Sequence, residues 1–196
     1  MQRARLHIVS GPSSGGKSQF IGTLEGSYDE LLFPSSLDAL APQPGRRYVL
    51  HYNLMRPMER LAKLHGAGSL EQRARALGLE MRMRVQNPFG TDRALRALKR
   101  LDTDACATVL VTSRAELERR MRARDARETL VEDGIAYPRE KWLELLAEVD
   151  LGALYRDWLE FLRSRGIPYA LVDAGDPTYR RLVSLGELRV CLMERG

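Results

Sequence analysis

Apolar positions along this chain form short continuous runs that are separated by stretches with helical spacing. The clearest runs are rich in β-branched and aromatic residues, as strands are, and they cover residues 4–10, 47–52, 105–112 and 168–173. The run at 105–112 is unbroken, which is typical of a central parallel strand buried on both faces. Shorter runs predict two more strands, one at 28–33 and a final edge strand at 187–193.

Between these runs, apolar residues recur at the spacing of one helix face, which predicts helices. We expect helices at 17–26, 58–65, 69–85, 91–101, 114–127, 139–148 and 151–165. Strands that alternate with helices predict an α/β fold with a mainly parallel sheet. The helical stretch 58–101 would then be an insertion over the carboxyl ends of the strands, where ligands bind in such folds. With 196 residues, the chain is expected to form a single domain.

The composition is that of an ordinary globular protein, with 44% hydrophobic and 29% charged residues. No apolar run approaches the ~20 residues of a membrane span, and no leader-like stretch precedes Gly11, so we expect a cytoplasmic protein. Cys106 and Cys191 stand apart and are expected to be buried thiols. The net charge of +5 is carried mainly by arginine. A nucleic-acid partner is not excluded, but it is not favoured, because basic and acidic residues mix along most helices.

One motif carries specific chemistry. Residues 11–18 read Gly-Pro-Ser-Ser-Gly-Gly-Lys-Ser and match the phosphate-binding pattern G-x-x-x-x-G-K-[ST] between a predicted strand and a predicted helix. Glycines let the backbone N–H groups of such a loop surround a phosphate. We expect Lys17 to reach the β- and γ-phosphates of ATP and Ser18 to ligate Mg²⁺. The predicted nucleotide-binding residues are Gly11, Ser13, Ser14, Gly15, Gly16, Lys17 and Ser18.

Other classes of P-loop protein are disfavoured by what the sequence lacks. It has no N-K-x-D segment for reading guanine, as GTPases have, and no Ser-Gly-Gly signature away from the P-loop, as transporter ATPases have. Residues 108–124 lead from a predicted strand into an arginine-rich helix. This region resembles the strand and lid of nucleoside and nucleotide kinases and of their shikimate and gluconate kinase relatives. Residues 169–177 are similar to the last core strand and adenine loop of the same kinases.

The resemblance implies a three-layer P-loop NTPase fold with a lid-like region over 114–137. In that family, lid arginines fold over the triphosphate, and Arg120 and Arg124 have the matching spacing. Residues four apart share one helix face, so two guanidinium groups can converge on the phosphates. The alternative is a solvated basic helix face that pairs with neighbouring acidic residues.

The acceptor side departs from the family pattern. These kinases usually carry an acidic residue at the end of a strand beside the P-loop, but strand 47–52 ends before Asn53 without one. We expect His51, Asn53 and Arg56 to face the acceptor at the ligand edge of the sheet, with a packed histidine and a surface arginine as the alternative. Asp38 is the candidate general base, and a turn residue or helix cap is its alternative role.

These expectations favour an ATP-dependent phosphotransferase that moves the γ-phosphoryl group to a hydroxyl or phosphate of a small molecule. The predicted catalytic residues are Lys17, Asp38, Arg120 and Arg124. Two alternatives stay open. A sulfotransferase also uses a P-loop-like anion cradle. A nucleotide-binding switch or nucleic-acid-associated protein would account for the missing acidic residue and for the pI of about 9.5.

Overall fold

The computed structural model describes residues 2–66, 69–123, 130–132, 135–137 and 139–193. Within these ranges, six strands form one sheet in the order β2-β3-β1-β4-β7-β8. Their bounds are β1 Ala4–Gly11, β2 Asp29–Leu31, β3 Arg47–Asn53, β4 Thr103–Val111, β7 Tyr169–Asp173 and β8 Arg181–Leu182. Neighbouring strands run parallel as far as β7, and β8 pairs with β7 in the antiparallel direction. The expected mainly parallel sheet is confirmed.

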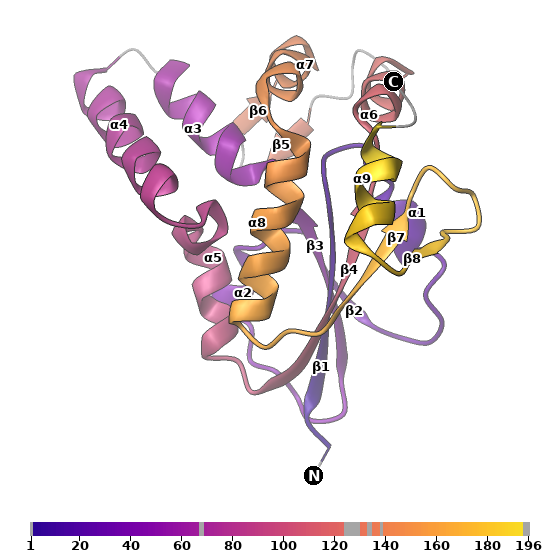
Figure 1. The fold of residues 1–196 in the computed structure, drawn as a ribbon. Coiled ribbons are helices and arrows are strands. Elements are labelled where there is room, and N and C mark those ends of the chain that lie inside the picture. The colour runs from indigo at the N-terminus through magenta and orange to yellow at the C-terminus, as the bar shows by residue number, and fades with distance from the viewer. Residues whose placement is uncertain (1, 67–68, 124–129, 133–134, 138, 194–196) are drawn as a thin grey trace.

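The described helices are α1 Lys17–Ile21, α2 Ser36–Ala39, α3 Arg56–Gly66, α4 Leu70–Val85, α5 Arg93–Arg96, α6 Arg114–Ala123, α7 Arg139–Glu148, α8 Leu151–Ser164 and α9 Leu185–Met193, with the short 3₁₀ turns η1 Pro88–Thr91 and η2 Ala97–Lys99. A separate hairpin pairs β5 Leu130–Glu132 with β6 Ile135–Tyr137. Figure 1 shows α3, α6 and α7 above the carboxyl ends of the strands, with α4 outside α3. Helices α3, α4 and α5 lie between β3 and β4 in the chain, within the segment expected to be a helical insertion.

Helices cover both faces of the sheet, because side chains alternate between two cores along each central strand. Leu6 and Ile8 of β1 point into the larger core, which α8 completes with Leu159. Val9, the residue after Ile8, points to the opposite face, into a smaller core with Ile21 of α1. This arrangement of sheet and helices is the α/β layout of a P-loop NTPase, with β1 at the centre and the phosphate-binding pattern at its carboxyl end.

A cluster of aromatic rings ties the insertion to the sheet. Trp158 of α8 stacks on Tyr52 of β3 and on Phe161, with ring centroids 4.8 and 5.4 Å apart, and it meets Phe89 of η1 edge-on at 4.9 Å. The indole Nε1 of Trp158 donates a hydrogen bond of 2.9 Å to the Ser10 hydroxyl. Since Ser10 directly precedes the phosphate-binding loop, this buried cluster fixes the base of that loop.

The expected final strand at 187–193 is wrong, because this segment belongs to helix α9. Leu188 and Cys191, three residues apart, are both buried in the larger core, so the burial has a helical period. The backbone N–H of Glu187 donates to the Ser184 hydroxyl at 3.1 Å, which caps the first turn. The short strand β8 forms the sheet edge instead.

Other sequence expectations need smaller corrections. The helix expected at 91–101 is divided among η1, α5 and η2, and the strand expected at 28–33 is shortened to β2. Burial of the run at 105–112 begins only at Ala107, so the thiol of Cys106 is exposed, whereas that of Cys191 is buried as expected. Among the described helices, none has the length and apolar character that a bilayer crossing requires.

Candidate active site

The P-loop connects β1 to α1 in a tight turn that only small residues allow. The backbone N–H of Gly15 donates to the Pro12 carbonyl at 3.0 Å, and a Cβ at Gly15 would lie 2.8 Å from that oxygen. Gly16 has φ 87°, a left-handed conformation that favours glycine. Ser14 adopts φ 61° although it is not a glycine, and such strained backbone occurs where surrounding structure holds it in place. The motif thus folds as its sequence predicts.

The side chains of Lys17 and Ser14 and the start of α1 surround the turn of the loop. The Lys17 ammonium donates to the carbonyls of Gly11 and Pro12, at 3.0 and 2.8 Å, so the lysine side chain folds back over its own loop. The Ser14 hydroxyl is buried and has no hydrogen-bond partner among the residues that the structure describes. No side chain caps the N-terminus of α1, so the leading N–H groups of that helix remain available to an anion.

A cavity of about 530 Å³ opens beside the P-loop. Its walls come from the P-loop, the segment after β2, the end of β3, α3 and α6. The lining residues are Ser13, Ser14, Gly15, Gly16, Lys17, Ser18, Gln19, Leu32, Phe33, His51, Asn53, Glu59, Lys63, Arg119, Arg120 and Ala123. This volume is in the range of small-molecule sites, and the cavity lies at the carboxyl edge of the sheet.

Arg120 of α6 fastens that helix to the P-loop. Its guanidinium donates to Glu116 Oε1 at 2.6 Å, to the Ala174 carbonyl at 2.6 Å and to the Ser14 carbonyl at 3.4 Å. The Arg119 guanidinium donates hydrogen bonds to both carboxylate oxygens of Glu116, each at 2.7 Å. Hydrogen bonds from Arg119, and then from Arg120, lower the pKa of Glu116 to about 2, so this carboxylate stays charged at neutral pH and keeps both arginines oriented.

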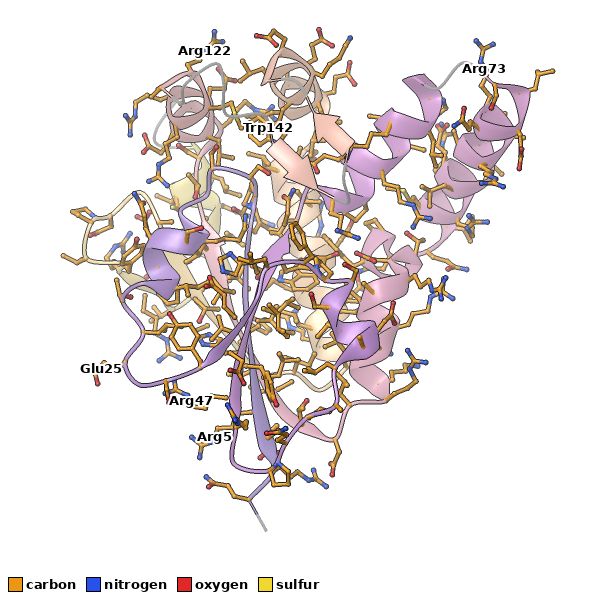
Figure 2. All side chains as sticks on the ribbon, turned by 180° about the vertical axis from the view of Figure 1, so that it is seen from behind. Arg5, Glu25, Arg47, Arg73, Arg122 and Trp142 are labelled. Atoms are coloured by element: carbon orange, nitrogen blue, oxygen red, sulfur yellow. The ribbon has the colours of Figure 1, made fainter. Side chains whose placement is uncertain are left out.

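A buried carboxylate faces the cavity from α3. Glu59 is only 5% exposed, and its Oε1 accepts hydrogen bonds from Asn53 Nδ2 at 3.0 Å and from Trp142 Nε1 at 3.1 Å. These contacts join the end of β3, the insertion and α7, and Figure 2 labels Trp142 at that upper end of the molecule. Glu59 therefore places an acidic side chain beside the end of β3, which carries none of its own.

The side-chain oxygens that line the cavity suit a magnesium ion that is bound together with a phosphate ligand. Ser18, Asn53 and Glu59 bring hydroxyl, amide and carboxylate oxygens to one cavity, and hard divalent cations take such oxygens. Within the described parts of the chain, no group of three or more His, Cys, Asp or Glu could hold a metal by itself. Magnesium is usually bound by few protein oxygens, phosphates and waters, so this sparse set suits it.

Not all predicted site residues meet in the cavity. His51 and Asn53 line it, and His51 Nε2 lies 2.5 Å from Glu30 Oε1. Arg56 instead forms an ion pair of 3.3 Å with Asp92. Asp38, expected as the general base, does not line the cavity. Its carboxylate is exposed on the short helix α2 and lies 3.3 Å from Arg100. Arg124 falls outside the described residues.

Sequence reasoning missed Glu59, Lys63 and Arg119 as cavity residues. Glu59 and Lys63 are four residues apart and so share one face of α3. The available signal was an acidic residue in the first helical turn after a strand that ends at the ligand edge. This signal is weak, because acidic residues are common in the first turn of any helix.

A segment of 67 residues is 34% identical to guanylate kinase from Corynebacterium diphtheriae and covers 34% of this chain and 35% of that protein. The match thus spans about a third of each protein. No protein-family model matches the chain. The similarity supports the broader expectation of a P-loop kinase, and within that group it favours nucleotide kinases over the shikimate and gluconate type.

Proposed function

We propose that this protein is an ATP-dependent phosphotransferase whose acceptor is a nucleotide, most simply a nucleoside monophosphate. The observation that carries the proposal is the cavity itself, which combines a P-loop, cationic side chains from two helices and a buried carboxylate. The partial similarity to a guanylate kinase supports a phosphate acceptor over a hydroxyl acceptor. Leu32 and Phe33, which line the cavity with exposed apolar surface, offer a place for a base to pack.

In the proposed reaction, an oxygen of the acceptor phosphate attacks the γ-phosphorus of ATP. The bond from that phosphorus to the bridging oxygen breaks, and ADP leaves with the bond's electron pair. Lys17, Arg119 and Arg120 stabilise the negative charge on the transferring group. An ionised phosphate has no proton to lose at the attacking oxygen, so this mechanism needs no general base and gives Asp38 no catalytic role.

Magnesium, when bound, would neutralise charge on the β- and γ-phosphates. Ser18 would contact the ion directly, and Asn53 and Glu59 would hold the waters around it. The Asn53–Glu59 hydrogen bond fixes both groups, because Trp142 also holds the Glu59 carboxylate from the other side. The cation side of the site therefore depends on contacts among β3, α3 and α7.

The alternative of a nucleotide-binding switch drew on the absence of an acidic residue beside the P-loop. Glu59 supplies a carboxylate in that cavity, so we favour turnover over passive binding. For the sulfotransferase alternative, the oxygen donors of Asn53 and Glu59 offer a sulfuryl group no advantage, whereas they suit a magnesium triphosphate.

Acceptor-stimulated ADP release tests the proposal. Purified protein is mixed with ATP, Mg²⁺ and each of a panel of nucleoside monophosphates, with sugars and polyols as the hydroxyl-acceptor arm. We expect ADP release to rise at least about 10-fold with one or more nucleoside monophosphates over ATP alone, because the acceptor completes the site. Stimulation only by hydroxyl compounds would replace the nucleotide acceptor. ADP release that no acceptor changes would overturn the phosphotransferase.

A further inference from the structure

A second concave surface lies in the helical insertion, lined by residues of α3, α4, η1 and α5. It has a volume of about 610 Å³, and five of its lining residues are arginines, namely Arg60, Arg75, Arg82, Arg93 and Arg96. The other lining residues are uncharged, and none is acidic or aromatic. We call this surface the arginine groove.

The positive charge of the arginine groove is largely uncompensated. Arg75 pairs with Glu71 at 2.5 Å. The other four arginines form no ion pair with any residue that the structure describes. Acidic residues nearby are engaged elsewhere, since Glu80 contacts Arg84 and Asp92 contacts Arg56. Clustered like charges repel one another, so a persistent cluster of this kind points to an anionic ligand.

The arginine groove is separate from the P-loop cavity, with α3 as the wall between them. Glu59 and Lys63 face the cavity, whereas Arg60 and Leu64, one position further along the helix, line the groove. A one-residue step turns a helix by about 100°, which accounts for the two different faces. A ligand in the groove is therefore not the phosphoryl acceptor, and the inference goes beyond the proposed function.

The exposure of the arginines decides between a small anion and a polyanion. All five side chains are exposed, so water screens each contact with a single phosphate. A polyanion gains much more, because every phosphate contact releases a condensed counterion. Lys99, exposed one turn beyond Arg96 and without a carboxylate partner among the described residues, extends the positive band along η2. The absence of aromatic lining residues removes the usual platform for stacking bases.

We propose that the arginine groove binds the phosphate backbone of a nucleic acid duplex without reading its sequence. Guanidinium groups suit this role, because their planar donors bind phosphate oxygens in pairs. Contacts to phosphates alone carry no base information, so duplexes of different sequence are expected to bind alike.

The test uses the full-length protein and a fluorescent DNA duplex of about 20 base pairs, titrated by anisotropy between ~50 and ~200 mM salt. The groove variant is Arg82→Gln/Arg96→Gln. The matched control is Arg73→Gln/Arg5→Gln, which removes the same charge. Arg73 lies about two and a half turns from Arg82 and so on the opposite face of α4. Figure 2 labels Arg73 on the insertion and Arg5 at the far end of the sheet.

We expect the wild type to bind with a Kd of roughly 1–100 µM and a steep salt dependence. The groove variant should lower the salt slope by about 2, since each lost phosphate contact removes ~0.9, and the control should leave it unchanged. Equal weakening by both variants would overturn the proposal, because net charge alone would then explain the binding. So would no binding by the wild type, or a preference above about 10-fold between two unrelated sequences.

Two further measurements keep the result interpretable. Binding of an ATP analogue by the groove variant must match the wild type, and we expect it to, because none of its changed residues lines the P-loop cavity. Tripolyphosphate at the same total phosphate concentration is the competitor arm. If it displaces the duplex as well as unlabelled duplex does, the groove is a site for small anions and the proposal fails.

Discussion

At the scale of single residues, Lys17 makes the clearest prediction. Its ammonium donates to the carbonyls of its own loop at 3.0 and 2.8 Å, which positions it over the proposed phosphate site. Under the proposed function, Lys17→Ala removes a charge that acts on the transferring phosphoryl group. We expect the acceptor-dependent rate to fall by roughly 100-fold or more while the melting temperature stays near that of the wild type. A wild-type rate in this variant would show that the loop does not hold the reacting phosphates.

The two candidate acidic residues can be separated by a matched pair of amide substitutions. Glu59→Gln keeps the size and the oxygen that accepts from Trp142, but it removes the charge behind the proposed magnesium site. We expect a rate loss of roughly 10- to 100-fold and a higher Mg²⁺ concentration for half-maximal rate, as for residues that hold a metal's surroundings. Asp38→Asn changes an exposed residue outside the cavity and should change neither quantity. Steady-state rates across a Mg²⁺ titration provide both values. A rate loss in Asp38→Asn without one in Glu59→Gln would instead give Asp38 the role in the reaction.

At the residue scale, the sequence alone predicted the P-loop but not Glu59. The P-loop was predictable because its glycines and its lysine serve one local backbone conformation, which eight consecutive residues determine. Glu59 was not, because its role depends on Trp142, which lies 83 positions away in the chain. No local pattern reports a contact of that kind.

At the scale of elements, helix α6 is held against the P-loop by the side chain of Arg120. Arg120 joins it to the P-loop and to the segment after β7 through one hydrogen bond to each, and a third bond to Glu116 lies within α6 itself. Arg120→Lys keeps the charge but cannot reproduce this planar fork. We expect a rate loss of roughly 10-fold or more and weaker ATP binding, measured by kinetics and by calorimetry. Arg122→Lys, on the exposed side of the same helix, is the control and should behave as the wild type.

Helix α8 carries the stability prediction. Trp158 is fully buried, stacks on Tyr52 and bonds Ser10 beneath the P-loop. Trp158→Ala opens a large cavity and should lower the free energy of unfolding by about 3–5 kcal/mol, measured by chemical denaturation. Leu70→Ala, at a side chain that is 85% exposed, should change it by no more than about 0.5 kcal/mol. Similar losses in both variants would mean that the aromatic cluster does not organise the core.

The elements that sequence predicted best were those with one dominant signal. The buried parallel strands had continuous apolar runs, and the helix expected at 69–85 begins at Ser69, whose Oγ accepts from Gln72 N at 3.2 Å as an N-cap. The segment 187–193 failed because a short apolar run fits a strand and a buried helix equally well. Its helical form is decided by packing of Leu188 and Cys191 against the core, which is tertiary information.

At the scale of the whole molecule, helix α3 separates two concave surfaces that have different lining residues. One face of this helix contributes Glu59 and Lys63 to the P-loop cavity, and another contributes Arg60 to the arginine groove. The mainly parallel sheet followed from strands alternating with helices, so this part of the layout was predictable. The division of the insertion into two surfaces was not, because it depends on how α3, α4 and α5 rotate about their own axes.

In the proposed function, the P-loop cavity transfers a phosphoryl group from ATP to a nucleotide. The most direct measurement follows ATP labelled in its γ-phosphoryl group, mixed with the best nucleoside monophosphate, Mg²⁺ and either wild-type protein or Lys17→Ala. We expect the label to appear in the corresponding nucleoside diphosphate with the wild type, at a rate roughly 100-fold or more above that of the variant. Label found only in inorganic phosphate, or at the same rate with both proteins, would show that the cavity does not catalyse this transfer.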